Sequence, residues 1–126
     1  MNENLSTGVR TASGVTILEF EGRITAGSTA IVLREAVRRE ADKNPKLILN
    51  LDKVTYCDSA GLGELVGCHT AMLNRRGTIK LCSLRQPIKQ LLHVTRLNTL
   101  FEVYENEAAA LDSFGGGART AHTGAK

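Results

Sequence analysis

One short polar sequence, Cys57-Asp58-Ser59-Ala60-Gly61, holds the side chains best placed to do chemistry. It follows the apolar run 47–51 and precedes an apolar-periodic segment from Leu62 to about Arg75, so a strand should pass into a helix at Asp58 and Ser59. Backbone N–H groups at a helix start lack intrahelical partners and favour negative charge. A serine there could act as a nucleophile, cap the helix or accept a phosphate.

The nucleophile interpretation lacks a base. The sequence around Ser59 matches the nucleophile elbow G-x-S-x-G without its first glycine. A catalytic serine also needs a histidine within hydrogen-bond reach. His69 lies further along the same predicted helix, roughly 15 Å away at a rise of 1.5 Å per residue. His93 belongs to another predicted helix and His122 to the C-terminal tail, so we do not expect an enzyme.

Motifs for cofactors and metals are also missing. No lysine follows Gly63 as a P-loop requires, and Gly61-x-Gly63 is too short for a dinucleotide fingerprint. Cys57, Cys68 and Cys82 form no C-x-x-C pair, so neither a zinc site nor a redox motif is indicated. We expect no cofactor and no metal, and we interpret the cysteines as small buried residues in a reducing compartment.

Composition restricts the remaining functions. The chain has 126 residues, of which 42% are hydrophobic and only 4% aromatic, so a single domain with an aliphatic core is expected. Sixteen Lys and Arg oppose thirteen Asp and Glu, without the clustered basic face that nucleic acid requires. No apolar run approaches the ~20 residues of a membrane span, and residues 1–10 lack a signal-peptide core. We predict a cytoplasmic protein that binds neither nucleic acid nor membrane.

The elements that would position Ser59 follow from the spacing of apolar residues. A weak strand at 8–11 and a strand at 15–21, which Gly22 ends, predict an N-terminal hairpin. Further strands are expected at 47–51, 78–82 and 101–104. Helices are expected at about 30–41, 62–75, 88–95 and 107–114, with caps at Ser28 or Thr29, at Ser83 and at Asn106. This order predicts an α/β fold with a mostly parallel mixed sheet of about five strands and about four helices.

The helix after Ser59 carries two more predictions. Its three glycines, at positions 61, 63 and 67, indicate a close approach of the backbone to a sheet or a partner. One of its faces is expected to carry Leu62, Leu65, Val66, His69 and Leu73. The domain should span 8–114, with flexible termini at 1–7 and 115–126.

A phosphate on Ser59 would suit a helix start. Its charge would meet free N–H groups, so the modified protein would stay folded, while the same charge would block an apolar partner. Leu62, between two glycines, could then be the apolar anchor for that partner. Spacing alone nevertheless favours a plain capping role for Asp58 and Ser59.

The hexapeptide Asp58-Ser59-Ala60-Gly61-Leu62-Gly63, after the strand 47–51 and Val54, resembles the Asp-Ser-Ser-Gly-Leu-Gly signature of the STAS family, the anti-sigma factor antagonists. The resemblance covers about residues 8–114, because the order of strands and helices also matches. The strand 77–82, followed by a proline-containing helix, matches as well. The resemblance implies the STAS fold and a protein that is phosphorylated on Ser59 rather than an enzyme.

The resemblance also implies a partner-switching cycle. The unphosphorylated protein would bind an anti-sigma factor that is a serine kinase of the histidine-kinase-like ATPase fold, and would thereby free a sigma factor. Phosphorylation of Ser59 would release it, and a PP2C-type phosphatase would reset it. The implied partner-binding residues are Asp58, Ala60, Gly61, Leu62 and Thr25. The protein itself is expected to be a monomer or a weak dimer. The alternatives are a STAS adaptor in chemotaxis, secretion or a stress complex, or a component of a lipid ABC transporter.

Two positions depart from the family pattern. Ala60 replaces the second serine of the signature, which leaves the acceptor Ser59 in place. Gly22-Arg23-Ile24-Thr25 stands where the family often has Gly-x-Leu-Asp, so Thr25 replaces an acidic residue. That loop lies near the phosphorylation site in the family, and we expect partner contacts to diverge there first.

Overall fold

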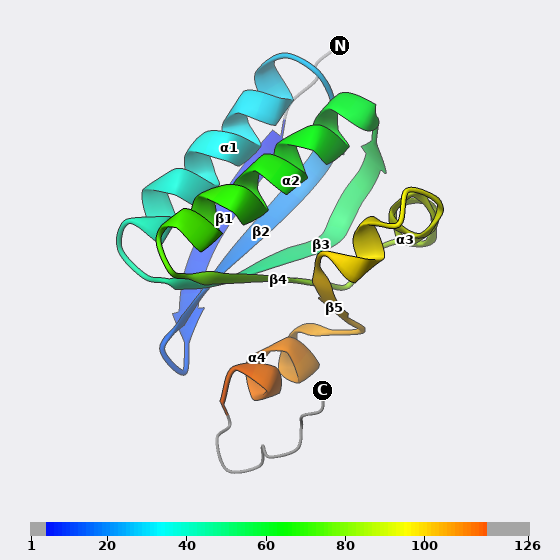
Figure 1. Cartoon of the computed structure of the whole chain (residues 1–126). Coiled ribbons are helices and arrows are strands. Elements are labelled where there is room, and N and C mark those ends of the chain that lie inside the picture. Colours follow the sequence, from blue (N-terminus) through cyan, green and yellow to red (C-terminus); the bar gives the residue numbers. More distant parts are fainter. Residues whose placement is uncertain (1–4, 116–126) are drawn as a thin grey trace.

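The chain folds around a five-stranded sheet whose strands lie side by side in sequence order (Figure 1). The computed structural model describes residues 5–115. The elements are β1 (Leu5–Ala12), β2 (Val15–Ile24), α1 (Ser28–Ala41), β3 (Lys46–Cys57), α2 (Ser59–Asn74), β4 (Thr78–Cys82), α3 (Gln86–Val94), the 3-10 turn η1 (Leu97–Thr99), β5 (Glu102–Tyr104) and α4 (Glu107–Gly115).

Strand directions confirm the predicted mixed sheet. β1 and β2 form an antiparallel hairpin, and its turn places Ser13 and Gly14 at φ of 53° and 78°. All later pairings are parallel, β2 with β3, β3 with β4 and β4 with β5. Parallel neighbours need crossover connections, and the helices α1, α2 and α3 supply them. The prediction of an α/β fold with an N-terminal hairpin is therefore confirmed.

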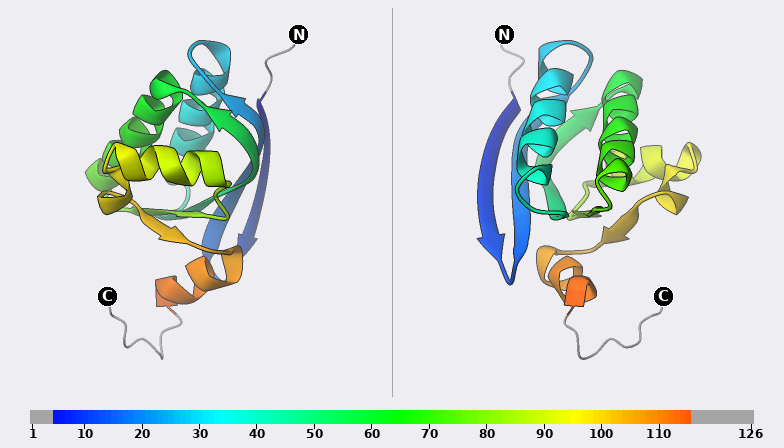
Figure 2. Two further views of the ribbon diagram at one scale, coloured as in Figure 1. Left: turned by 90° about the vertical axis from the view of Figure 1, so that its right-hand side faces the viewer. Right: turned by 60° about the vertical axis from the view of Figure 1, so that its left-hand side comes forward.

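Helices cover the two faces of the sheet unequally (Figure 2). α1 and α2 lie side by side across one face, and together with α3 they enclose the larger core. The buried aliphatic side chains of β2 and β3, including Leu18, Leu49 and Leu51, point into this core. The opposite face carries a smaller cluster that α4 covers. The two faces thus differ in the amount of apolar surface that holds their helices.

The first two strands are longer than expected. β1 begins at Leu5, which is buried and pairs with Gly22, so the prediction of a flexible terminus is wrong for residues 5–7. β2 does not end at Gly22 but continues to Ile24, because β3 extends to Cys57 and offers a partner along that length. Shifts of register between β2 and β3 absorb the irregularity at Gly22. Residues 1–4 and 116–126 lie outside the described part of the chain.

The buried face of α2 differs from the predicted one. Leu62 and Leu65 are buried as expected, but the stripe continues through Cys68 and Met72 rather than through Leu73. Leu73 is 60% exposed, because α2 must face α1 and the sheet at once and its inner face is rotated accordingly. His69 lies at the margin of this stripe, with its ring 5.3 Å from that of Phe101.

Of the caps predicted for α1, α3 and α4, the first two are wrong. α1 begins after Gly27, and the Thr29 hydroxyl instead accepts a hydrogen bond from the Thr25 amide at 2.9 Å. α3 begins after Arg85, because Ser83 adopts a left-handed conformation (φ 61°) at the end of β4 and cannot cap a helix there. The third cap is confirmed, since the Asn106 side chain accepts a hydrogen bond from the Ala109 amide at 2.8 Å.

Two leucines of α2 provide a matched test of this packing. Leu65→Ala should lower the free energy of unfolding by about 2–5 kcal/mol, because it leaves a cavity in the larger core. Leu73→Ala should change it by less than about 0.5 kcal/mol, because that side chain is mostly in solvent. Urea unfolding monitored by circular dichroism measures both values. Equal losses would contradict the observed orientation of α2.

Candidate functional site

Ser59 is the first residue of α2. It lies where the carboxyl ends of β2 and β3 meet, and we call this end of the sheet the Ser59 edge (Figure 1). Its side chain is exposed, and its hydroxyl forms no hydrogen bond with any residue between 5 and 115. The capping role falls to the preceding residue, Asp58, rather than to Ser59. The serine hydroxyl is therefore accessible from solvent and is not engaged in holding the fold.

The Asp58 carboxylate joins the start of α2 to the loop between β2 and α1. One oxygen accepts a hydrogen bond from the Gly61 amide at 2.8 Å, and the other accepts one from the Ala26 amide at 3.4 Å. The Asp58 amide in turn donates to the Ile24 carbonyl at 3.2 Å. These three contacts confirm the predicted helix cap and give Ser59 a fixed position beside that loop.

Gly61 allows α2 to approach the end of β2 closely. A Cβ at this position would lie 2.2 Å from the carbonyl oxygen of Ile24, which is far inside van der Waals contact. The prediction of close backbone approach is thus correct for Gly61. Gly63 has no atom within 4 Å of the same position and Gly67 meets only the end of the Glu64 side chain, so neither lies against the sheet, and an approach to a partner at these two glycines stays a prediction.

Thr25 stabilises its own loop. Its hydroxyl lies 3.2 Å from that of Thr29, and its carbonyl accepts a hydrogen bond from the Ala30 amide at 3.1 Å. The residue is half-buried, and as a threonine it brings no charge to this position. The loop next to Ser59 is held by hydrogen bonds inside the chain.

The implied partner-binding residues are not equally accessible. Ala60 is exposed beside Ser59, whereas Gly61 is covered by Ile24. Leu62 is only 6% exposed and belongs to the larger core. The helix turns the Leu62 side chain inward with that of Leu65, and a direct contact of Leu62 with a partner stays a prediction.

A hollow beside Ser59 was missed by the sequence. It has a volume of about 490 Å³, and residues of the β3–α2 junction and of α3 line it: Tyr56, Cys57, Asp58, Ser59, Pro87, Ile88 and Leu91. Tyr56 is 45% exposed, and the guanidinium of Arg23 lies over its ring at 4.6 Å. Tyr56 stands next to the signature in sequence, but nothing in the sequence brings α3 to the same place.

Among residues 5–115, no histidine is hydrogen-bonded to Ser59, and no group of side chains could hold a metal ion. Burial and the charge of Asp58 raise the pKa of the Cys57 thiol to about 12, so it stays protonated at neutral pH. What the site offers is an accessible hydroxyl beside a partly apolar hollow.

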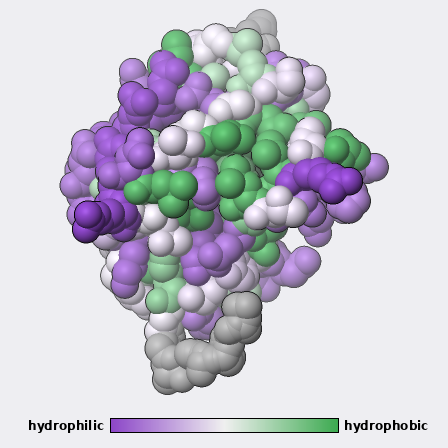
Figure 3. Space-filling model, viewed as in Figure 1, coloured by the Kyte–Doolittle hydropathy of each residue, from purple (hydrophilic) through white to green (hydrophobic). Residues whose placement is uncertain are grey.

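Another apolar area lies on the face shown in Figure 3. Hydrophobic side chains gather there along α2 and toward α3, whereas the outer side of α1 is largely hydrophilic. His69, Leu73 and Leu100 line a hollow of about 200 Å³ where the second half of α2 meets the start of β4 and the segment before β5. Within the described part of the chain, no helix is long and apolar enough to cross a membrane.

Comparison with known proteins assigns the family. The STAS domain matches residues 7–110, a range that contains β2 to β5, all but the first two residues of β1, and the Ser59 edge. The chain therefore belongs to the STAS family. It is 26% identical over 111 residues to the anti-sigma F factor antagonist of Paenibacillus polymyxa, an alignment that covers 86% of this chain and 93% of that relative.

Solved structures share the fold. The crystal structure of an anti-sigma factor antagonist from Mycobacterium paratuberculosis has a TM-score of 0.79 at 24% identity, and covers 90% of this chain and 96% of its own. The phosphorylated form of the Bacillus cell fate determinant SpoIIAA has a TM-score of 0.66 at 13% identity, with coverage of 86% and 99%. These similarities confirm the STAS fold expected from the sequence.

The glycines of α2 allow a matched pair of substitutions. Gly61→Ala should destabilise the protein by more than about 2 kcal/mol, because the new methyl group would overlap the backbone of Ile24. Gly63→Ala should stabilise it by about 0.5–1 kcal/mol, since alanine is the better helix former and the position is open. Thermal and urea unfolding measure both changes. A stabilising Gly61→Ala would contradict the contact between α2 and β2.

The Asp58 cap makes a separate prediction. Asp58→Ala should lower the free energy of unfolding by about 0.5–2 kcal/mol, because the Gly61 amide loses its acceptor. Asp58→Asn keeps a carbonyl oxygen in the same position and should stay within about 0.5 kcal/mol of the wild type. If both variants lose the same stability in urea unfolding, the carboxylate charge, and not the cap, carries the effect.

Proposed function

We propose that this protein is an anti-sigma factor antagonist whose partner binding is switched by phosphorylation of Ser59. The observation that carries the proposal is the exposed hydroxyl of Ser59 at the start of α2, which no residue between 5 and 115 hydrogen-bonds and which follows a residue that already caps the helix. The Paenibacillus relative, 93% of which is covered by the alignment, is named an anti-sigma F factor antagonist, and this name supports the same function.

The start of α2 suits a phosphate. The N–H groups of Ser59 and Ala60 belong to the first turn and have no acceptor within the helix. A phosphate on the Ser59 oxygen would add about −1.5 to −2 charges at the positive end of the helix dipole. Because the side chain is exposed, the phosphate needs no rearrangement of the core. Folding and modification are therefore compatible.

The same phosphate would change the surface that a partner meets. Ser59 lines the hollow together with Tyr56, Pro87 and Leu91. A partner could fill this hollow with apolar groups. A doubly charged group at its rim would have to be desolvated on binding, which opposes association. The loop and the helix that carry this surface are held in place by four of the implied partner-binding residues: Asp58, Gly61, Leu62 and Thr25.

The partner in this proposal is an anti-sigma factor that is also a serine kinase of the histidine-kinase-like ATPase fold. It binds the unmodified surface, transfers the γ-phosphate of ATP to the Ser59 oxygen and releases the product together with ADP. A PP2C-type phosphatase hydrolyses the phosphoserine and restores binding. The protein itself is a substrate and a binding module in the cytoplasm, and catalyses none of these steps.

Substitution of Ser59 tests the assignment. With ATP and the anti-sigma kinases of the source genome, each purified, the wild type should gain one phosphate and Ser59→Ala none, by intact-mass spectrometry. Ser28→Ala is the matched control, because Ser28 is also exposed and also begins a helix, α1. It should be phosphorylated like the wild type. Full phosphorylation of Ser59→Ala would show that the acceptor lies elsewhere.

A further inference from the structure

α4 lies alone on its face of the sheet, away from the Ser59 edge (Figure 2). Its single fully buried side chain is that of Ala110, while Leu111 and Phe114 are only partly covered. Beneath it lies an apolar strip of four almost fully buried residues: Val15, Ile17, Ile48 and Cys82. The apolar contact that holds α4 is thus small compared with that of α1 or α2.

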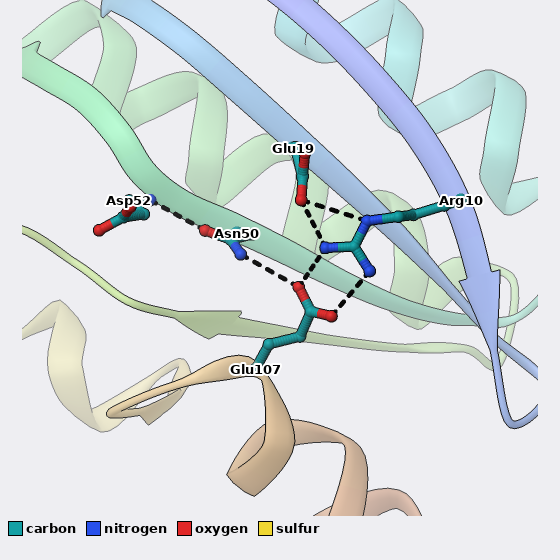
Figure 4. Close-up of polar contacts among 5 residues, drawn as sticks. All are labelled: Arg10, Glu19, Asn50, Asp52 and Glu107. Carbon is teal, nitrogen blue, oxygen red and sulfur yellow. Dashed lines mark hydrogen bonds and ion pairs between the residues drawn. The ribbon is translucent and has the colours of Figure 1, made fainter.

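The first residue of α4 is clamped to two strands (Figure 4). The carboxylate of Glu107 accepts two hydrogen bonds from the Arg10 guanidinium, at 2.8 and 2.6 Å, and one from the Asn50 amide at 3.1 Å. Arg10 is also paired with Glu19. The bonds from Arg10 hold the pKa of Glu107 below its usual range. This N-terminal clamp joins α4 to β1 and β3.

The end of α4 is clamped to β4. Lys80 is only 6% exposed, and its Nζ donates to the Ser113 hydroxyl at 2.7 Å and to the Ser113 carbonyl at 3.3 Å. The same Nζ lies 4.2 Å from the centre of the Phe114 ring and 3.2 Å from a carboxylate oxygen of Glu102. The C-terminal clamp is therefore also polar, with an aromatic ring over the charge.

Helices held by few apolar contacts are the parts of a domain that open first. The bidentate bonds between Arg10 and Glu107 fix the geometry of the helix start. Because this ion pair is partly exposed to solvent, it contributes little net stability. We propose that α4 is a strap that detaches as a unit from the otherwise folded domain. Its two polar clamps then set how often the apolar strip under it is uncovered. This opening is independent of the modification of Ser59.

Two of the three cysteines make the proposal measurable in the unaltered protein. Cys82 belongs to the strip beneath α4 and is fully buried. Cys68 is buried in the larger core on the other face, whereas Cys57 lines the hollow beside Ser59 and is not used as a reference. Detachment of α4 exposes Cys82 and leaves Cys68 buried, whereas global unfolding exposes both. A thiol reagent therefore separates the two events within one molecule.

The experiment follows iodoacetamide labelling of each cysteine by peptide mass spectrometry, with rates normalised to those in the urea-unfolded chain. In the wild type, Cys82 should react at least about tenfold faster than Cys68, and low urea should accelerate Cys68 far more, because its exposure needs global unfolding. Glu107→Gln and, separately, Ser113→Ala should each raise the Cys82 rate about three- to tenfold and leave the Cys68 rate unchanged.

Asp42→Asn is the matched control, since it removes an exposed ion pair with Arg75 on the α1 and α2 side of the domain. It should leave the Cys82 rate unchanged. The proposal is overturned if Cys82 reacts at the same rate as Cys68, because exposure would then require unfolding of the whole domain. It is equally overturned if Glu107→Gln and Ser113→Ala accelerate Cys82 and Cys68 together, or if neither changes the Cys82 rate.

Discussion

The contact between the backbone of Gly61 and the carbonyl of Ile24 is the constraint on which the Ser59 edge depends. Without a side chain at Gly61, α2 can begin directly against the end of β2. Asp58 then reaches the Gly61 and Ala26 amides at once and joins the helix to the neighbouring loop. Ser59 lies between Asp58 and Gly61 in sequence, so these two residues position it. Its own hydroxyl is left for other chemistry.

The two faces of the sheet serve different purposes in this arrangement. α1, α2 and α3 share a large aliphatic core, and the Ser59 edge lies at one end of that core. The proposed phosphate switch at Ser59 needs such a rigid base, because the charge must change the surface and not the fold. α4 covers a smaller strip and is held by charged groups at both ends. The least apolar attachment in the domain is thus kept away from the Ser59 edge.

Sequence patterns predicted elements better than orientations. β4 has the predicted bounds, and the Asn106 cap is where it was expected, because both follow from residues adjacent in sequence. Leu73 was expected to lie on the same face as Leu65 but points to solvent, since the packing of α2 against α1 selects the buried stripe. The Ser83 cap failed for a similar reason, because the exit from β4 gives that residue a left-handed backbone.

The sequence by itself determined the strand-to-helix junction, the cap at Asp58 and the family signature around Ser59, because each depends on residue types at short, regular spacing. Only the tertiary structure decided which of those residues a partner can reach. Leu62 turns into the core with its helix, while Tyr56, Pro87 and Leu91 meet beside Ser59 because α3 packs next to the end of β3. Contacts between residues far apart in sequence leave no local periodicity, so these parts of the site required the folded chain.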